Sequence, residues 1–202
     1  MKLRLLNGSH STLAYLGFLA GHVTIWEASS DPPLATLIKR QMTEEIVPTL
    51  AAPPGTDLAA YCAQLVVRFR NPALPHRTQQ IAMDGSQKLP QRLLGTVRDR
   101  IAAGAPYRHL ALAVAGWIRY ASGVDEAGQP IAVSDPMAAT FASITLAAGN
   151  DPARIAAGFL DLEAVFGVDL GANAAFRAAV TRNVVALFRD GVQAALAHHL
   201  TG

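Results

Sequence analysis

The chain has 202 residues, of which 51% are apolar and only 16% are charged. This charged fraction is well below the roughly 25% that is usual for soluble domains, so the composition excludes an intrinsically disordered chain. Seventeen Lys and Arg against fifteen Asp and Glu give a formal net charge of +2, with the two signs interspersed. The sequence has no run of basic residues that could lie along a phosphate backbone, so the charge pattern disfavours a nucleic-acid-binding protein.

The sequence shows no features of a membrane span, a secretion signal or a structural metal site. The longest apolar runs, such as 110–118, are far shorter than the roughly 20 residues that a span needs. No uninterrupted apolar stretch precedes Asn7, which predicts a cytoplasmic protein with no membrane partner. The single cysteine, Cys62, excludes an internal disulfide, and no Cys/His ligand spacing indicates a metal. We expect one domain, stabilised by burial of apolar surface.

Helical spacing of apolar residues dominates the chain and predicts an all-α fold. Leucines from Leu3 to Leu19 outline an amphipathic helix that is interrupted at the turn-favouring pair Asn7-Gly8. Further helices are predicted over 32–50, 57–69 and 77–104, because Pro and Gly lie mostly at the ends of these segments.

The carboxyl-terminal half is predicted to be helical around one fully buried element. From 107 to 121 the apolar residues occur nearly all round, which is typical of a central helix. Ser134-Asp135-Pro136 and Asn150-Asp151-Pro152 are typical of helix starts, and 173–200 is predicted to be one long terminal helix. The polar residues of 123–133 leave a short hairpin and an irregular loop both open.

Three polar residues near the amino terminus suggest chemistry. Lys2, Asn7 and His10 fall within about 140° of arc on a regular helix, so one broad face could hold all three. A lysine, an amide and an imidazole together suit proton transfer to a carbonyl oxygen, with Asn7 as the donor to the developing negative charge. The alternative is that Lys2 is solvated, Asn7 belongs to a turn and His10 packs at the surface.

The segment 71–92 is unusually polar for this chain, and polar loops on packed scaffolds often carry binding sites. Its Arg and Lys side chains recognise carboxylates and its Asp accepts hydrogen bonds from hydroxyls, which suits an anionic or polyhydroxylated ligand. Equally, Asp-Gly-Ser forms turns and helix caps, and the cations could be solvated. The candidates are His76, Arg77, Asp84, Ser86 and Lys88.

Other notable side chains are predicted to have structural roles. Met83, Cys62 and several aromatic residues occur at helical spacing among aliphatic residues, which favours core packing over a cofactor site. The aromatic residues are Trp26, Phe69, Trp117, Tyr120 and Phe141. His198 and His199 are predicted to interact with a helix dipole or with solvent.

Two segments resemble a known enzyme family. KLRLLNGSHS, residues 2–11, resembles the Lys-x4-Asn-x2-His motif of the polyol-specific long-chain dehydrogenases, the mannitol dehydrogenase family. Residues 71–92 are similar to its fructuronate reductase, or D-mannonate oxidoreductase, branch. The resemblance implies two parts, a Rossmann-type domain that binds NAD and a helical domain similar to the carboxyl-terminal domain of 6-phosphogluconate dehydrogenase. Residues 1–202 resemble only the second part, because no G-x-G-x-x-G motif follows a predicted strand.

The resemblance also implies the roles of the motif residues. Lys2 would be the general acid/base, Asn7 the donor that stabilises the oxyanion, and His10 a hydrogen-bonding substrate ligand. No metal is required for this chemistry.

Substrate recognition is implied for the second segment. Lys88 stands at a position that contributes to substrate binding in the family, and Asp84 is a further candidate for a substrate hydroxyl. Gln80 stands where the mannitol branch tends to carry arginine, which favours a hexuronate over a plain polyol. Arg77 is a candidate for the substrate carboxylate, and a solvated Arg77 remains open.

We therefore predict the all-α substrate domain of an NAD-dependent enzyme that interconverts fructuronate and mannonate, with a Rossmann domain as its partner. Met1 directly precedes the catalytic motif, which indicates a truncated reading frame or an excised fragment, and we expect these residues alone to be inactive. An uncovered interdomain surface would favour self-association. The alternatives are a mannitol, arabinitol or tagaturonate dehydrogenase domain, and a non-catalytic helical interaction module.

Overall fold

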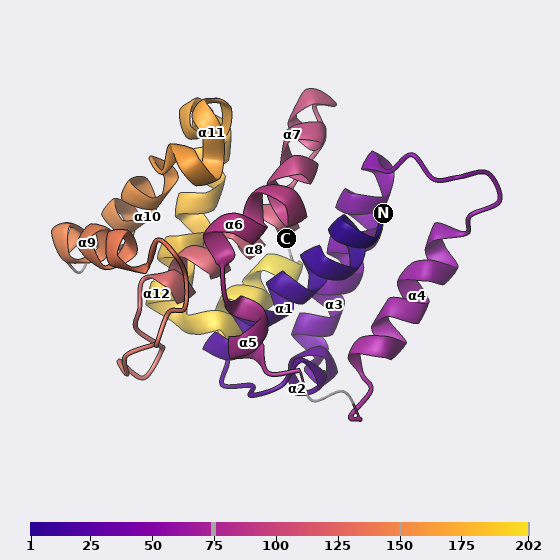
Figure 1. The fold of residues 1–202 in the computed structure, drawn as a ribbon, viewed down its shortest axis with the longest axis horizontal. Helices are drawn as coiled ribbons and strands as arrows, with labels where there is room; N and C mark the ends of the chain where they lie inside the picture. The colour runs from indigo at the N-terminus through magenta and orange to yellow at the C-terminus, as the bar shows by residue number, and fades with distance from the viewer. Residues whose placement is uncertain (74–75, 150, 202) are drawn as a thin grey trace.

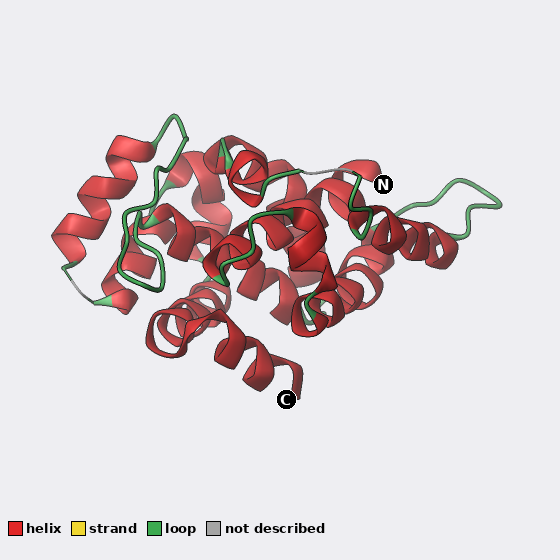
Figure 2. Ribbon diagram, turned by 90° about the horizontal axis from the view of Figure 1, so that it is seen from below, coloured by secondary structure: helices red, strands yellow, loops and turns green. Residues whose placement is uncertain are grey.

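The computed structural model describes residues 1–73, 76–149 and 151–201. In these ranges the ordered elements are helices, and β-type pairing is limited to two isolated bridges (Figure 2). The predicted all-α class is therefore confirmed. Asn150, part of a predicted helix start, and Pro75, part of the polar segment 71–92, lie outside the described residues.

Most helices follow one another with short connections, and the longer loops precede α4 and join α8 to α9 (Figure 1). The amino-terminal half contains η1 (Leu3–Asn7), α1 (Gly8–Leu19), α2 (Ile25–Ser30), α3 (Pro32–Arg40), η2 (Gln41–Ile46), η3 (Val47–Thr49), α4 (Leu58–Phe69), α5 (Thr78–Ala82), α6 (Gly85–Leu89), η4 (Pro90–Leu94) and α7 (Gly95–Ala102). The carboxyl-terminal half contains α8 (Arg108–Ala121), α9 (Ala138–Ala148), α10 (Pro152–Leu160), α11 (Glu163–Ala172) and α12 (Ala174–Thr201). The segments η1, η2 and η4 are π-helical turns.

Two helices, α1 and α8, form the buried centre. Every residue of α8 from His109 to Ala121 is buried, as predicted for 107–121. The two helices approach closely because Gly116 has no side chain; a Cβ there would lie 2.7 Å from Cδ2 of Leu16. The prediction of an amphipathic first helix is wrong for α1, which is buried nearly all round because α2, α5 and α8 all pack against it.

An aromatic group joins α8 to the carboxyl-terminal helices. The ring of Trp117 lies 5.6 Å from those of Phe141 and Phe159 and 6.0 Å from that of Phe166, measured between centroids. These rings come from α9, α10 and α11, which form the orange layer at the left of Figure 1. Large aromatic side chains contribute much of the apolar area in a core, so this group holds the layer in place.

The core predictions are confirmed with two exceptions. Cys62, Phe69, Trp117, Tyr120 and Phe141 are buried in the apolar core. Two side chains are instead partly exposed, and for them the prediction is wrong: Trp26 is 40% and Met83 is 37% exposed. Trp26 lies on the six-residue helix α2 and Met83 lies between the short helices α5 and α6, where helical spacing does not determine burial.

The predicted interruption at Asn7-Gly8 is wrong. Both residues have right-handed helical backbone angles, and the chain passes from η1 into α1 without a break. The N–H of Gly8 donates to the carbonyl of Leu3, five residues earlier, which is the π-helical pattern. The pair therefore marks a wider helical turn rather than the end of a helix.

The prediction of a continuous helix over 77–104 is wrong at its centre. Asp84 has φ of 55° and ψ of 37°, a left-handed conformation that ends α5 and begins α6. Beyond this point α6, η4 and α7 form one helical run, in which Pro90 begins the π-helical turn. A left-handed aspartate is one of the few non-glycine conformations that local hydrogen bonding supports.

Helix ends account for the other differences. Asp151 caps α10 as predicted, and α9 begins at Ala138, shortly after the predicted start at 134–136. Asp135 accepts from the N–H of Met137, directly before α9, and also from Ser86. Gly191, with φ of 75°, divides the predicted single helix over 173–200. The helix α2 was not predicted; its six residues are too few for periodicity, and a capping box between Thr24 and Glu27 begins it.

The polar segment 123–133 is a loop with one isolated bridge, between Val124 and Pro130. The buried Arg119 of α8 donates from Nη2 to the carbonyl oxygen of Asp125 at 2.9 Å, and from Nη1 to that of Val124. Of the two open alternatives, the irregular loop is therefore the observed one.

We predict that Gly8→Ala lowers the free energy of unfolding by about 1–3 kcal/mol. A Cβ on Gly8 would lie 2.8 Å from the carbonyl oxygen of Arg92, so the two helices would have to separate. Gly95→Ala is the matched control, because its Cβ would meet nothing closer than 3.5 Å and alanine favours a helix by about 1 kcal/mol. Urea denaturation measures both, and equal stability of the two variants would contradict the prediction.

The end of α12 is held by a polar group around two histidines. Nδ1 of the buried His109 lies 2.8 Å from Nε2 of His199, and Arg108 donates to the carbonyl of His199. The prediction of a solvent or dipole role for His199 is therefore wrong. Burial lowers the pKa of His109. Burial also lowers the pKa of His199, to about 4, with further lowering by His109, Arg108 and Arg40. Both rings are consequently neutral near pH 7.

We predict that His199→Gln weakens the loss of stability in acid. Unfolded histidine titrates near pH 6.5 and folded His199 near 4, so between these values the unfolded chain binds more protons. The free energy of unfolding should therefore fall as the pH falls from about 7 to 5. In His199→Gln this fall should be about 1 kcal/mol smaller than in the parent protein. His198→Gln, at the exposed neighbour, is the control in urea titrations at both pH values. If the parent, His199→Gln and His198→Gln lose the same free energy of unfolding between pH 7 and 5, His199 is not the cause of the acid destabilisation.

Candidate active site

One continuous helix carries the three residues of the amino-terminal motif. Lys2 is exposed at its start, Asn7 ends η1, and His10 lies in the first turns of α1. The π-helical bond from Gly8 to Leu3 widens this turn, so residues five positions apart lie closer to the same side than on a regular helix. Lys2 and Asn7 are separated by five positions, and the local structure therefore helps to place both on one face.

A second helical run lies against this one. The run α6–η4 packs on η1–α1, and Nη1 of Arg92 donates a hydrogen bond of 3.0 Å to the Oγ of Ser11. One turn before Arg92, Nζ of Lys88 donates to the carbonyl oxygen of Met83 at 2.5 Å and lies 3.7 Å from Oδ2 of Asp84. The predicted residues Asp84 and Lys88 are thus brought together, next to an arginine from the same run.

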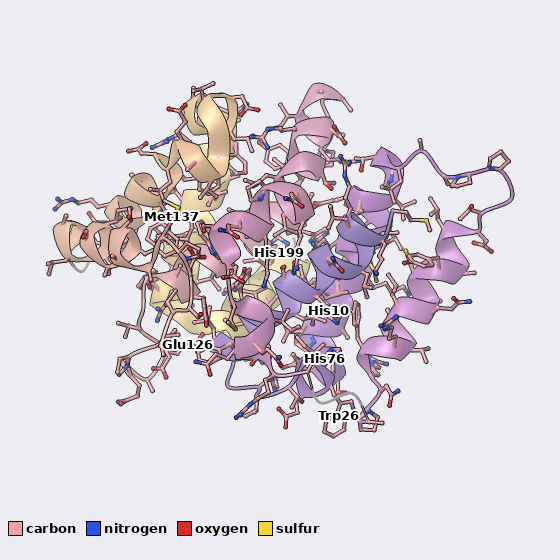
Figure 3. The ribbon with its side chains drawn as sticks, viewed as in Figure 1. His10, Trp26, His76, Glu126, Met137 and His199 are labelled. Atoms are coloured by element: carbon pink, nitrogen blue, oxygen red, sulfur yellow. The ribbon has the colours of Figure 1, made fainter. Side chains whose placement is uncertain are left out.

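The ring of His10 lies in a small polar crevice beside α4 (Figure 3). Its centroid is 4.6 Å from that of Phe69 and 6.0 Å from that of His76. Burial lowers the pKa of His10 to about 4, with further lowering by His76, Arg92 and Arg68. The imidazole is therefore neutral near pH 7 and has one N–H donor and one acceptor nitrogen for a hydroxyl group.

The charges on the second run favour an anion. Burial lowers the pKa of Lys88, as does the charge of Arg92, while Asp84 and Asp135 act in the opposite direction. Burial also lowers the pKa of Arg92. These two partly desolvated cations lie one turn apart. Within the described residues only Lys88 has an ion-pair partner, Asp84, so a bound anion would relieve their repulsion.

A carboxylate from a distant segment anchors this run. Asp135 accepts hydrogen bonds from the N–H of Ser86 at 2.8 Å, from its Oγ at 2.6 Å and from the N–H of Met137 at 2.9 Å. The N–H of Asp84 also donates to the carbonyl of Ser134. Ser86 is buried and its hydroxyl donates to Asp135, which gives this candidate a structural role.

The remaining predicted residues lie on or before α5, which packs against α1. Arg77 is exposed and its backbone pairs with Thr24, while the carbonyl of His76 accepts from the N–H of Ile25. Gln80 is exposed. Arg77 directly precedes α5, whereas Lys88 lies on α6, so the two side chains come from different helices.

Sequence reasoning missed three residues of this region. Arg92 lies four positions after Lys88, a spacing that places both on one side of a helix. Asp135 was read only as a helix start. Tyr15 is completely buried, which raises the pKa of its phenol, and within the described residues its hydroxyl has no hydrogen-bond partner. Nothing in the sequence distinguished it from a packing aromatic residue.

Other surfaces carry no predicted site residue. A groove of about 610 Å³ lies between α3, η2 and α4, and its lining includes Lys39, Arg40 and Arg70. In the part of the chain that the structure covers, no three His, Cys, Asp or Glu side chains are arranged to hold a metal ion. None of the described helices is long and apolar enough to cross a bilayer.

The sequence matches a family model described as the mannitol dehydrogenase C-terminal domain over residues 1–188. The chain belongs to this family. The D-mannonate oxidoreductase of Escherichia coli (strain K12) is 51% identical over 197 residues, which cover 98% of this chain and 40% of that protein. Both the predicted family and its helical second domain are therefore confirmed.

Solved structures of the family share the fold. Mannitol 2-dehydrogenase of Pseudomonas fluorescens, in a ternary complex with NAD and D-mannitol, matches with a TM-score of 0.92 and 36% identity, over 100% of this chain and 40% of that one. D-sorbitol dehydrogenase in substrate-free form matches with a TM-score of 0.85 and 28% identity, over 96% of this chain and 39% of that one. This family member therefore spans about two fifths of the length of these relatives.

We predict that Asp135→Ala lowers the free energy of unfolding by about 2–4 kcal/mol, because three buried or half-buried donors lose their acceptor. Ser86→Ala removes only one of these bonds and should cost about 1 kcal/mol. Chemical denaturation measures both variants. If Asp135→Ala is no less stable than Ser86→Ala, the carboxylate does not anchor the run that carries Lys88.

Proposed function

We propose that this chain is the substrate-binding part of an NAD-dependent oxidoreductase that interconverts fructuronate and mannonate. The observation that carries the proposal is the packing of η1–α1, with Lys2, Asn7 and His10, against α6–η4, with Lys88. This packing puts proton-transfer groups and an anion-binding cation on neighbouring helices. The 51% identity to a D-mannonate oxidoreductase supports a sugar acid as the substrate.

The described residues do not fit the dinucleotide itself. A pyrophosphate cradle of the Rossmann type needs a strand followed by a glycine-rich turn, and no strand occurs in residues 1–73, 76–149 or 151–201. We therefore assign NAD to a separate Rossmann domain, which the length of the relatives leaves room for. The bound nicotinamide would supply or accept the hydride, and this chain would handle the proton and the substrate.

Each motif residue has a role that suits its position. The exposed ammonium of Lys2 would give its proton to the ketone oxygen as this becomes an alcohol, and would take it back in the reverse direction. The amide of Asn7 would donate to the same oxygen, where negative charge develops. The neutral ring of His10 would bind a substrate hydroxyl, and Lys88 would contact a hydroxyl or the carboxylate.

Two further predicted ligands are retained in the proposal. Asp84 would accept from a substrate hydroxyl beside Lys88, to which it already lies close. Gln80 lies on α5 and Arg77 directly precedes this helix. Both would contact the solvent-facing side of the substrate. Leu3, beside Lys2 in the chain, and Met83, beside Asp84, are exposed apolar side chains, and they suit a surface that another domain covers or through which copies self-associate.

We predict that Lys2→Ala lowers kcat for fructuronate reduction by about 10²–10⁴-fold, the usual contribution of a general acid. The assay follows NADH oxidation by the complete reading frame with fructuronate, tagaturonate and fructose. Lys39→Ala, an exposed lysine on α3, is the matched control and should keep the parent rate.

The other outcomes each overturn part of this proposal. Turnover of fructose alone would move the chain to the mannitol branch, and turnover of tagaturonate alone would change the sugar acid. An unchanged kcat in Lys2→Ala would remove the lysine from proton transfer. No turnover of any substrate would leave a non-catalytic interaction module as the better assignment.

A further inference from the structure

Arg92 differs from the other arginines that are at least partly buried. Each of the others has a carboxylate or a carbonyl oxygen as acceptor; they are Arg4, Arg40, Arg98, Arg100, Arg108, Arg119 and Arg177. Within the described residues, Arg92 bonds only the hydroxyl of Ser11, at 3.0 Å. A guanidinium has five N–H donors, so most of its donor capacity has no acceptor in the described part of the chain.

The surroundings of Arg92 do not neutralise its charge. Lys88 adds a second cation one turn away, and the charge of Arg92 lowers the pKa values of both Lys88 and His10. Of the two nearby carboxylates, Asp84 lies against Lys88, and Asp135 already accepts three hydrogen bonds. A half-buried cation with no ionic partner is costly, and proteins keep such groups where a ligand supplies the charge.

The position of the guanidinium also suits a ligand. Ser11 is the first residue after His10 on α1, and its hydroxyl holds one edge of the guanidinium, which leaves the other edge as a planar fork. Such forks bind carboxylates through two parallel hydrogen bonds. The carbonyl oxygen of Arg92 lies under Gly8, so its backbone is held directly against the helix that carries the amino-terminal motif.

We propose that Arg92 binds the carboxylate of the substrate, assisted by Lys88, and thereby makes the site select sugar acids over uncharged sugars of the same skeleton. The proposal rests on the proposed function, in that it requires this site to accept a sugar acid. It assigns to Arg92 the role that charge complementarity alone suggested for Arg77, which is exposed and precedes a different helix from the one that carries Lys88.

The test compares Arg92→Gln with the parent enzyme, both made from the complete reading frame. We expect kcat/KM for fructuronate to fall by about 10–100-fold, chiefly through KM, because one charge-assisted bidentate contact is lost. The rate with fructose, which has no carboxylate, should stay within about threefold of the parent or rise. Arg182→Gln, at an exposed arginine of α12, controls for the loss of one positive charge and should change neither substrate.

Two further variants keep the test decisive if Arg92→Gln does not fold. Arg92→Lys retains the charge without the fork, and should raise KM for fructuronate by a smaller factor at unchanged kcat. Ser11→Ala retains the whole guanidinium but removes its anchor, and should also raise that KM. Thermal unfolding of each variant shows whether it is folded.

The outcomes separate this inference from the proposed function. A parent enzyme that does not reduce fructuronate or another sugar acid refutes the function. A parent that does so, with Arg92→Gln or Arg92→Lys showing a parental KM, refutes only the role of Arg92. An equal loss with fructuronate and fructose would also overturn it, because a carboxylate contact cannot affect a substrate that has no carboxylate.

Discussion

The close approach of two helical runs at Gly8 is the contact on which the candidate site depends. Here α1 begins directly above the carbonyl oxygen of Arg92, at a distance that leaves no space for a Cβ. The π-helical turns η1 and η4 meet at this point and pack together. Because π-turns have poorer hydrogen-bond geometry and occur often at functional sites, their pairing beside the candidate motif of Lys2, Asn7 and His10 is consistent with a constraint from function.

The rest of the core keeps this contact in place. Helix α1 has no exposed face on which to move, since α8 and other helices surround it, and Gly85 at the start of α6 lies directly against Trp117 of α8. The aromatic group around Trp117 therefore supports the run that carries Lys88 and Arg92 from beneath. Close-packed interiors transmit such constraints, so the positions of the two cations depend on residues far from them in the sequence.

Much of the fold follows from the sequence because long helices have a periodic signal. The buried helix over 107–121 was predicted for this reason, whereas the cap at Asp151 was predicted from its position before Pro152. The differences occur where a tertiary contact decides the local structure. Asp135 binds the distant Ser86 in addition to the N–H of Met137 before α9, and Asn7-Gly8 continues a helix because α1 is packed on several sides. Left-handed Asp84 is likewise held by a bond from its N–H to the distant Ser134.

The candidate site was only partly predictable, for a related reason. Motif spacing predicted Lys2, Asn7 and His10, and the polar composition of 71–92 with the family resemblance predicted Lys88, because these signals are present in the chain alone. Whether an arginine is neutralised, however, depends on which carboxylates and carbonyls the fold brings to it. In the described residues the fold supplies an oxygen acceptor with negative charge or a carbonyl dipole to every other arginine that is not exposed, and gives Arg92 a single hydroxyl. This difference between Arg92 and the other arginines depends on the fold and could not be predicted from the sequence. It indicates that the charge of Arg92 serves a ligand, because no group in the described part of the fold neutralises this charge.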